Sequence, residues 1–330
     1  PAENWTGLFR AGERIRLRLI NASAMSIFNV RIPGLAMTVV QADGLNVQAV
    51  ETDELQIGTA ETFDVIVQPA EDQAYTLMAE SSDGFGYARA TLAPRAGMEA
   101  PVPPLRERPP LTMKDMGMGD MAHDMPAGAE HGELVPATTG AMDHSAMDHA
   151  AMGHTAVTPP PVAPAMNMSA MDHAAMGHTA VTPPPAAPAM DHSQMAMQAH
   201  PHPQGYGVAG VAMSPVNRLN ERPAGLTDVP HRVLVYTDLH SLLPRADTRA
   251  PHRELQLHLT GNMERYMWSF DGRKFSEVSQ PIGLAFNERV RLTFVNDTMM
   301  PHPIHLHGMF FDVVTGDEDH PPRKHTLVLK

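Results

Sequence analysis

The chain has 330 residues, enough for about two domains of ordinary size. Its formal net charge of −13 argues against nucleic acid as a partner, because such binding needs a basic stripe. No apolar run reaches the roughly 18 residues that a transmembrane helix needs, so no transmembrane segment is expected. The absence of cysteine excludes disulfides and zinc–thiolate sites, and the 25 methionines are the outlier in the composition.

Residues 1–95 are predicted to form a β-domain. Residues 14–19 alternate polar and apolar side chains, which is the pattern of a half-buried strand. Many short strands with turn signals between them, and no amphipathic helix, indicate an antiparallel sandwich or barrel, so the fold class is all-β. The further strands are expected at residues 27–32, 37–40, 54–57, 62–68, 75–79 and 87–92.

Residues 96–217 differ sharply in composition from the β-domain before them. Prolines between residues 101 and 110 mark an extended linker. From Ala88 to Gly205 there is no Phe, Tyr or Trp. Such a segment cannot bury enough apolar surface to offset its ordering entropy, so it is expected to be disordered without ligand.

This insertion carries a repeated pattern of methionine and histidine. Residues 113–200 hold 15 Met and 9 His, and residues 145–161 recur word for word at residues 169–185. Thioether sulfur selects Cu(I) and imidazole accepts copper in both oxidation states, so the repeats are predicted to bind copper. The candidate ligands are Met142, His144, Met147, His149, Met152, His154, Met171, His173, Met176, His178, Met190 and His192.

Two other interpretations of the repeats compete with copper binding. A methionine-rich surface can pack on a partner, and repeat slippage can leave a pattern without a selected role. The proline runs break any helix that would carry a methionine stripe. Methionine beside Asp-His is also not an apolar face, so copper binding is favoured.

Residues 218–330 are predicted to form a second β-domain, with strands at residues 232–236, 254–259, 265–270 and 290–295. His258 alternates with two leucines and is expected on a polar face. His231, His240 and His252 are expected at the surface, and the sequence leaves the roles of His320 and His325 open.

Three imidazoles follow the last of these strands in the segment Pro301-His302-Pro303-Ile304-His305-Leu306-His307-Gly308. Successive side chains of extended backbone point to opposite faces, so His305 and His307 share one face and His302 points to the other. One metal gathering all three would need a sharp bend, whereas two metal positions served by one strand fit more easily. A lone strand histidine is ordinarily a core or surface residue, but three within six residues indicate metal ligation. Imidazole suits copper, zinc, iron and nickel, so the spacing does not name the metal.

The two β-domains look like copies of one another. Residues 13–21 (ERIRLRLIN) match residues 288–296 (ERVRLTFVN) at an offset of 275 residues. Carried on without gaps, this offset aligns His302 with Ile27, His305 with Val30 and His307 with Ile32. Two unrelated sandwich strands can match this well, but the shared Glu-Arg and Asn favour duplication. The first domain is then expected to be a metal-free spacer or interface.

With these motifs in view, the chain resembles the copper-resistance protein A family of multicopper oxidases over nearly its whole length. Residues 5–9 (WTGLF), 21–25 (NASAM) and 59–67 (TAETFDVIV) look like the second cupredoxin domain of that family. Residues 259–268 (LTGNMERYMW) and 295–300 (VNDTMM) resemble its third, and the Met-Asp-His units resemble its Met-rich insertion. The implied fold is a pair of cupredoxin-like Greek-key β-sandwich domains, at residues 1–95 and 218–330, joined by a long disordered Met/His-rich insertion at residues 96–217.

The resemblance implies copper as the cofactor, in type 1, type 2 and paired type 3 centres of the complete protein. His302 would be a ligand of the type 1 copper, where electrons enter. His305 would hold the type 2 copper and His307 one of the type 3 coppers, where dioxygen is reduced to water. The implied function is a periplasmic oxidase of Cu(I), with phenols as side substrates. Copper ions, dioxygen and other periplasmic copper-handling proteins are the implied partners.

The sequence also departs from the family pattern. The family has a first domain with two His-x-His pairs and a late His-Cys-His motif, and neither is present here. The chain opens on Pro1 without Met and stops at Lys330 in a strand-like run, so both ends are expected to be cut. Because only three of the many copper ligands of the family pattern are present, the polypeptide alone is expected to be inactive. The alternative function is a non-catalytic protein that sequesters Cu(I) through the Met-Asp-His repeats. A cupin-like metalloenzyme is disfavoured, because it leaves His302 and the repeats unexplained.

Overall fold

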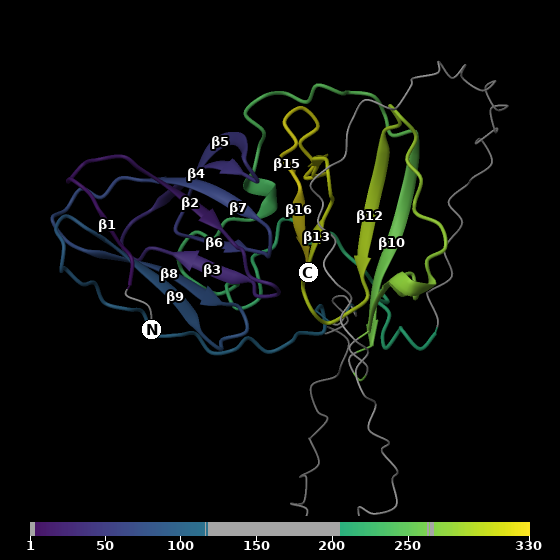
Figure 1. Cartoon of the computed structure of the whole chain (residues 1–330), viewed down its shortest axis with the longest axis horizontal. Coiled ribbons are helices and arrows are strands. Elements are labelled where there is room, and N and C mark those ends of the chain that lie inside the picture. The colour runs from purple at the N-terminus through teal and green to yellow at the C-terminus, as the bar shows by residue number, and fades with distance from the viewer. Residues whose placement is uncertain (1–3, 116, 118–204, 263, 265–266) are drawn as a thin grey trace, which may run out of the picture. The chain divides into compact units, whose positions relative to one another are not determined.

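The computed structural model describes residues 4–115, 117, 205–262, 264 and 267–330 (Figure 1). In this part of the chain the regular structure is strand, apart from two short 3-10 helices, η4 (Tyr236–Asp238) and η5 (Phe275–Glu277). No helix among the described residues is long and apolar enough to cross a bilayer. The predicted all-β fold class is confirmed. Most of the predicted insertion, residues 118–204, lies outside the described residues.

The first β-domain consists of two sheets that share one core. Their strand orders are β1-β9-β8-β3-β6 and β2-β7-β4-β5. Buried residues of both sheets meet in the core, among them Val30 and Leu55 from one sheet and Val39 and Val65 from the other. Neighbouring strands pair antiparallel, except that β1 runs parallel to β9. The strands are β1 (Thr6–Leu8), β2 (Ile15–Ile20), β3 (Phe28–Arg31), β4 (Met37–Ala42), β5 (Leu45–Thr52), β6 (Glu54–Ile57), β7 (Thr62–Val67), β8 (Tyr75–Ser81) and β9 (Tyr87–Ala93).

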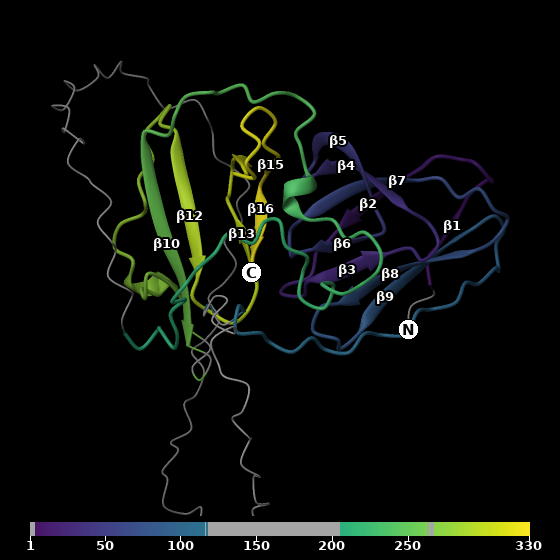
Figure 2. The ribbon, with the colours of Figure 1, turned by 180° about the vertical axis from the view of Figure 1, so that it is seen from behind.

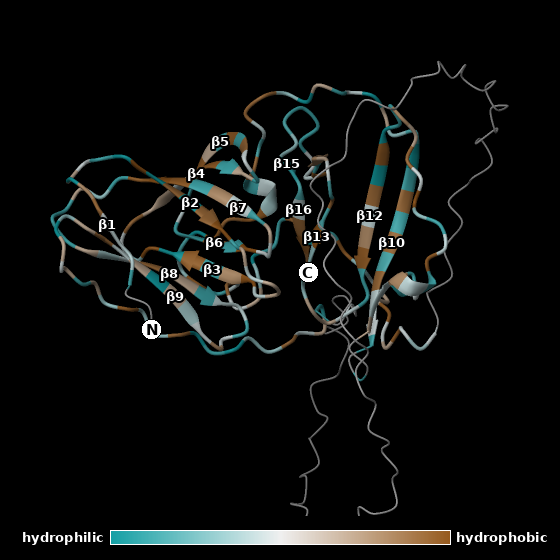
Figure 3. Cartoon of the chain, in the orientation of Figure 1, coloured by the Kyte–Doolittle hydropathy of each residue, from teal (hydrophilic) through white to brown (hydrophobic). Residues whose placement is uncertain are grey.

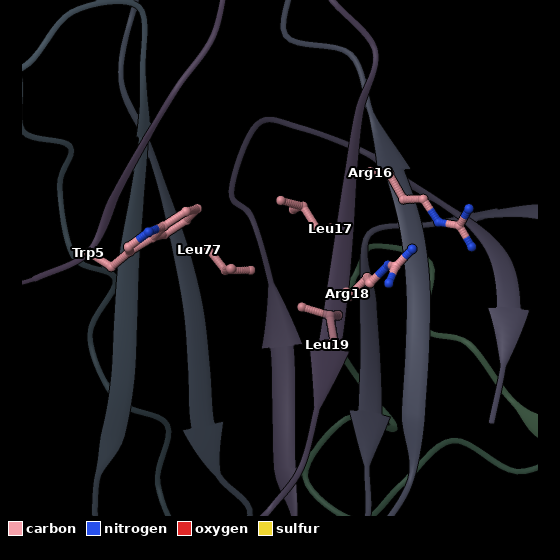
Figure 4. Close-up of a pocket in the computed structure, with 6 residues that line it drawn as sticks. All are labelled: Trp5, Arg16, Leu17, Arg18, Leu19 and Leu77. Atoms are coloured by element: carbon pink, nitrogen blue, oxygen red, sulfur yellow. The ribbon is translucent and has the colours of Figure 1, made fainter. Parts of the chain in front are cut away.

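Strand β2 uses its alternating sequence as predicted. Leu17 is buried, and on the opposite side the guanidinium of Arg16 lies 2.6 Å from the carboxylate of Asp64. The two leucines of the strand face the side of Leu77, whereas the two arginines point away (Figure 4). A shallow depression at this place is lined by Trp5, Arg16, Leu17, Arg18, Leu19 and Leu77. It contains no imidazole and lies apart from the histidine motif.

The start of the predicted linker is fixed to the first domain by charge. Arg106 donates two hydrogen bonds to the buried carboxylate of Glu54, at 2.8 Å and 2.7 Å, and a third at 3.1 Å to Glu80. His231 Nε2 lies 2.6 Å from the same Glu54 carboxylate. Because Glu54 is fully buried, these partners compensate a charge that water cannot reach.

The second β-domain has a three-stranded sheet of order β11-β10-β12 and two strand pairs, β13 with β16 and β14 with β15. Hydrophobic and hydrophilic residues alternate along β10 and β12 (Figure 3). The predicted strand at residues 232–236 is wrong, because Val233 makes only an isolated bridge to Glu54 before the chain turns into η4. The strands are β10 (Arg253–Asn262), β11 (Met267–Phe270), β12 (Val290–Asn296), β13 (His302–His305), β14 (Phe311–Asp312), β15 (Arg323–Lys324) and β16 (Thr326–Leu329).

The structure supports the internal duplication through its strand register. Strand β3 pairs with β6 from Phe28↔Ile57 to Arg31↔Glu54, and β13 pairs with β16 from His302↔Leu329 to His305↔Thr326. The pair β13–β16 lies side by side in both ribbon views (Figure 1, Figure 2). Strands β4 and β5 begin their pairing at Met37↔Thr52, and β14 and β15 begin theirs at Phe311↔Lys324. The same order of paired strands therefore occurs twice.

A shared asparagine turn shows where the gap-free alignment fails. In the first copy Asn21 Nδ2 donates to the carbonyl of Ser26, five residues on, and in the second Asn296 Nδ2 donates to Met300, four residues on. The second turn is thus one residue shorter.

That missing residue shifts the histidine alignment by one position. Strand β13 begins at His302 where β3 begins at Phe28, so Phe28 is the counterpart of His302 in place of Ile27. Arg31 likewise replaces Val30 as the counterpart of His305, and Pro33 replaces Ile32 as that of His307. None of these three residues is a metal ligand, so the first copy still lacks the motif.

Candidate metal centre

Strand β13 separates the three imidazoles of the motif into two groups. The ring of His302, at the start of the strand, lies edge-on to Trp268, with ring centroids 4.3 Å apart. The ring of His305, at its end, lies 5.0 Å from the ring of His307. This separation agrees with the prediction from strand geometry that His302 faces away from the other two.

The turn before β13 orients the ring of His302. Thr298 donates its hydroxyl hydrogen to Asn296 Oδ1 at 2.7 Å, so Thr298 Oγ1 is left to accept from His302 Nε2 at 3.1 Å. This leaves Nδ1 of His302 as the nitrogen with a free lone pair. Partial burial lowers the pKa of His302, which favours the neutral imidazole that metals bind.

His305 is held through its other nitrogen. Its Nδ1 lies 2.8 Å from the carbonyl oxygen of His325 and 3.0 Å from Thr326 Oγ1. A carbonyl oxygen only accepts, so Nδ1 carries the proton and Nε2 keeps the free lone pair. His302 and His305 therefore offer opposite ring nitrogens, which suits ligation of two different metals from one strand.

His325 is a neighbour that the sequence left undecided. Its ring lies 5.1 Å from that of His305, nearly perpendicular to it, and 5.7 Å from Phe310. The pairing of β13 with β16 places it there, because Thr326 is the register partner of His305. The strand-like run at residues 326–329, which directly follows His325, was the signal in the sequence that could have found it.

The imidazoles do not make a complete site among themselves. Within the described ranges, no three His, Cys, Asp or Glu side chains converge well enough to hold a metal ion. The donor set fits copper in kind, since neutral imidazoles are accompanied by exposed thioethers. Met299 is 50% exposed, Met300 41% and Met309 52%, so these residues remain accessible beside the motif.

The remaining described histidines are engaged elsewhere. His258 is buried with Nδ1 2.8 Å from Asp297, so the expected polar-face position is wrong. It is buried because that carboxylate satisfies its ring, and Asp297 in turn accepts from the backbone N–H of Ala212 at 2.9 Å. His240 pairs with Asp317 at 2.6 Å, and His320 lies 2.9 Å from the carbonyl of Ser241.

The twelve predicted ligands of the insertion cannot be placed in this way. They lie outside the described residues: Met142, His144, Met147, His149, Met152, His154, Met171, His173, Met176, His178, Met190 and His192. Their copper binding stays a prediction.

Comparison with known proteins identifies the class to which this fold and motif belong. Multicopper oxidase family models match residues 1–96 and residues 248–330, which correspond to the two β-domains. The chain belongs to the multicopper oxidase family. Membership implies copper centres in the full-length proteins of the family.

Within that family the chain is similar to copper resistance protein A. It is 48% identical over 329 residues to the protein of that name from Escherichia coli, covering 99% of this chain and 51% of the relative. It is 50% identical over 331 residues to copper resistance protein A of Pseudomonas syringae pv. tomato, again covering 99% of this chain and 51% of the relative. The chain thus spans about half the length of the curated relatives it matches.

A solved structure supports the fold across both β-domains. Fet3p, described as a multicopper oxidase that functions in iron import, aligns with 99% of this chain and 50% of its own. The TM-score is 0.51 at 13% sequence identity, so the likeness concerns the fold alone. The predicted cupredoxin-like sandwich fold is confirmed.

Proposed function

We propose that the chain is part of a periplasmic copper-resistance oxidase that converts Cu(I) to Cu(II) and reduces dioxygen to water with four electrons. The observation that carries this proposal is that β13 presents its histidines on two opposite sides. His302 presents Nδ1 on one side of the strand, and His305 presents Nε2 beside His307 on the other. The activity belongs to the full-length protein, of which this chain provides the described domains.

Each imidazole has a distinct role in this proposal. His302 is a ligand of the type 1 copper, His305 of the type 2 copper and His307 of one type 3 copper. The coppers, when bound, supply one-electron transfer and the reduction of dioxygen. The protein supplies orientation: Thr298 fixes the ring of His302, and the peptide carbonyl of His325 fixes that of His305. Only two residues of β13 separate these two ligands, which gives a short covalent connection between the centres.

The Met/His repeats collect Cu(I) for this site. Support comes from the described residues at the two ends of the insertion. Ser214 N–H donates to the carbonyl of Gly117 at 2.9 Å, and Ala209 N–H donates to Gly261 at 2.9 Å. Gly261 is the register partner of Trp268, whose ring meets His302. The insertion is therefore anchored on the strand pair that carries the neighbour of His302.

A substrate comparison in the full-length protein tests this role. Replacing Met147, Met152, Met171 and Met176 by Leu is expected to raise the KM for Cu(I) while leaving oxidation of a bulky phenol unchanged. Met195→Leu with Met197→Leu, outside the repeated units, is the matched control. Equal loss of both activities in the repeat variant would contradict a collecting role.

The 330-residue chain on its own is expected to have no oxidase activity. It contains no cysteine, so it has no thiolate to join a type 1 centre. Purified as 330 residues and given Cu(I), it is expected to consume no dioxygen beyond the copper-only background. Uptake above that background would refute this part of the proposal.

A copper-sequestering protein is the second candidate, and the repeats themselves favour it. The word-for-word recurrence of residues 145–161 at residues 169–185 multiplies soft ligands without adding any group that performs redox turnover. Sequestration predicts stoichiometric Cu(I) uptake by the full-length protein with no oxidation to Cu(II). Catalytic oxidation of many Cu(I) per chain would exclude it.

A further inference from the structure

Four side chains meet in a buried cluster that the proposed copper ligation does not use. Lys324 Nζ lies 3.0 Å from Asp43 and 3.2 Å from Glu61, and all three side chains are fully buried. Tyr236 donates its hydroxyl to Glu61 at 2.8 Å and accepts from the N–H of Val328 at 3.1 Å. Asp43 and Glu61 come from the first β-domain and Lys324 from the second, so the cluster joins the two copies.

Burying these charges costs free energy of desolvation, so a buried charge cluster needs partners that compensate it. Two carboxylates face one ammonium, and desolvation of such groups generally exceeds their mutual attraction. Backbone N–H groups compensate part of the cost for the two carboxylates. Glu61 accepts from Gly58 N–H at 2.7 Å, and Asp43 Oδ1 accepts from Thr62 N–H at 3.1 Å. The other oxygen of Asp43 points at the second domain.

Asp43 Oδ2 accepts two backbone hydrogen bonds beside the carbonyl that faces His305. Asp43 Oδ2 accepts from the N–H of His325 at 3.0 Å and from the N–H of Thr326 at 3.1 Å. The N–H of Thr326 and the carbonyl of His325 belong to one peptide unit. The carboxylate therefore holds one end of the peptide whose other end accepts from His305 Nδ1 at 2.8 Å.

A peptide that donates to a carboxylate is polarised, and its carbonyl becomes a stronger acceptor. A strong acceptor at 2.8 Å from Nδ1 favours the ring form with its proton on Nδ1. Without that acceptor, the proton is free to move to Nε2, and the nitrogen left for a metal changes. The first domain contains no histidine of its own in residues 4–115, yet its Asp43 carboxylate bonds the peptide that faces His305.

We propose that Asp43, held by Lys324, is a positioning residue for His305, fixing its Nδ1–H form through the peptide between His325 and Thr326. That the unprotonated Nε2 of His305 binds a metal rests on the proposed function, but the Nδ1–H form itself exists without metal. Thr326 Oγ1, at 3.0 Å from His305 Nδ1, is an assisting contact that the peptide carbonyl outweighs.

Nitrogen NMR of the metal-free chain tests this directly. The full 330-residue chain is labelled with ¹⁵N-histidine and kept with a chelator at neutral pH, and His305→Gln identifies the signals of His305. The expected wild-type spectrum shows a protonated Nδ1 and an unprotonated Nε2. A wild-type His305 with its proton on Nε2 overturns the proposal.

Matched variants separate the carboxylate from the hydroxyl. Asp43→Asn removes the charge that polarises the peptide and is expected to move His305 toward a mixture of both ring forms. Thr326→Val is expected to retain the Nδ1–H form, because the carbonyl remains polarised by Asp43. Asp72→Asn, at an exposed carboxylate 2.9 Å from Arg95, is the control and leaves the ring unchanged. If Thr326→Val shifts the ring and Asp43→Asn does not, the hydroxyl and not the carboxylate positions His305, and the proposal fails.

A metal titration distinguishes this inference from the proposed function. With Cu(II) alone as the probe, Asp43→Asn is expected to weaken binding that depends on His305 by about 10–100-fold, the usual effect of losing a partner behind a ligand. Retention of wild-type Cu(II) affinity by Asp43→Asn, in a chain where His305→Gln abolishes it, counts against the positioning role. A wild-type Nδ1–H ring with no His305-dependent Cu(II) binding refutes the ligand assignment while supporting the positioning.

Discussion

The indole of Trp268 and the imidazole of His302 meet nearly edge to face, with 4.3 Å between ring centroids and 71° between ring planes. Trp268 is 37% exposed, so the residue whose ring meets His302 is itself partly open to solvent. Burial is also the cause of the lowered pKa of His302. The contact therefore places a partly exposed aromatic residue against the imidazole proposed as the type 1 ligand.

Trp268→Leu is expected to raise the pKa of His302 toward its ordinary value of about 6.5, because the ring regains water. With the lowered pKa, the folded chain binds fewer protons here than the unfolded chain does. Its stability therefore falls as the pH drops through about 6.5, and this fall is expected to flatten in the variant. Histidine NMR titration measures the pKa, with Trp5→Leu in the first domain as control. An unchanged His302 pKa would show that other groups desolvate the ring.

The paired asparagine turns allow a comparison within one molecule. Asn296→Ala removes the acceptor that orients Thr298, and is expected to cost about 1 kcal/mol of stability and to weaken Cu(II) binding that depends on His302. Asn21→Ala, at the equivalent turn, is expected to cost about 1–3 kcal/mol because Asn21 is buried, without any effect on the metal. Urea unfolding and copper titration measure the two effects. Equal loss of copper binding in both variants would mean that general destabilisation is the cause.

Arg106 is predicted to be the main attachment of the linker to the first domain. Arg106→Met leaves the buried carboxylates of Glu54 and Glu80 without their main partner, and is expected to cost about 3–5 kcal/mol. Arg95→Met removes an exposed pair with Asp72 and is expected to cost less than about 1 kcal/mol. Denaturant unfolding of both variants gives the comparison. Similar small values would show that the linker detaches without consequence.

Tyr236 is expected to make the stability of the fold depend on pH in the alkaline range. Burial beside Glu61 raises the pKa of Tyr236 well above its ordinary value of about 10. Above that pH the unfolded chain loses the phenolic proton while the folded chain keeps it, so stability falls as the pH rises. Tyr236→Phe is expected to reduce this alkaline fall, while costing about 1–3 kcal/mol at neutral pH by leaving Val328 N–H unpaired. Melting temperatures measured from neutral to alkaline pH test both parts, and parallel curves would contradict the first.

Gly58 is the place where the first domain leaves room for β16. A Cβ added at Gly58 would collide with the side chain of Val328, whereas at Gly86 it would meet no atom. Gly58→Ala is therefore expected to cost about 1–3 kcal/mol by overpacking, and Gly86→Ala little. Thermal unfolding distinguishes them. A neutral Gly58→Ala would show that this contact yields easily.

The sequence predicted the parts of the fold that depend on local pattern. Alternation located β2, and strand composition located the other long strands of the first domain. It missed β1 and β5, since the former is short and the latter reads polar at Asn46, Gln48 and Glu51. Residues 232–236 look like a strand, but their groups bond mainly to β6 by single contacts, which composition does not reveal.

At the site, spacing predicted the separation of His302 from His305 and His307, because it follows from the period of extended backbone. It did not predict His325 or Asp43, which reach the motif through pairing across about 20 and more than 260 residues. The buried pairing of His258 was also missed, because its partner Asp297 stands 39 positions further along the chain. Local pattern reports which face a side chain occupies, whereas its partners depend on register between distant strands.

The turn bearing Asp43 is held at a φ of 49°, a conformation that few side chains accept without strain. Mutational scans that rank positions by distance from the imidazoles would place this turn among the unimportant loops of a domain that contains no histidine. The Asp43 carboxylate, however, bonds the backbone beside His305. Changes there are expected to alter the ring form of a histidine in the neighbouring domain, so the copy without the histidine motif constrains the evolution of the copy that carries it.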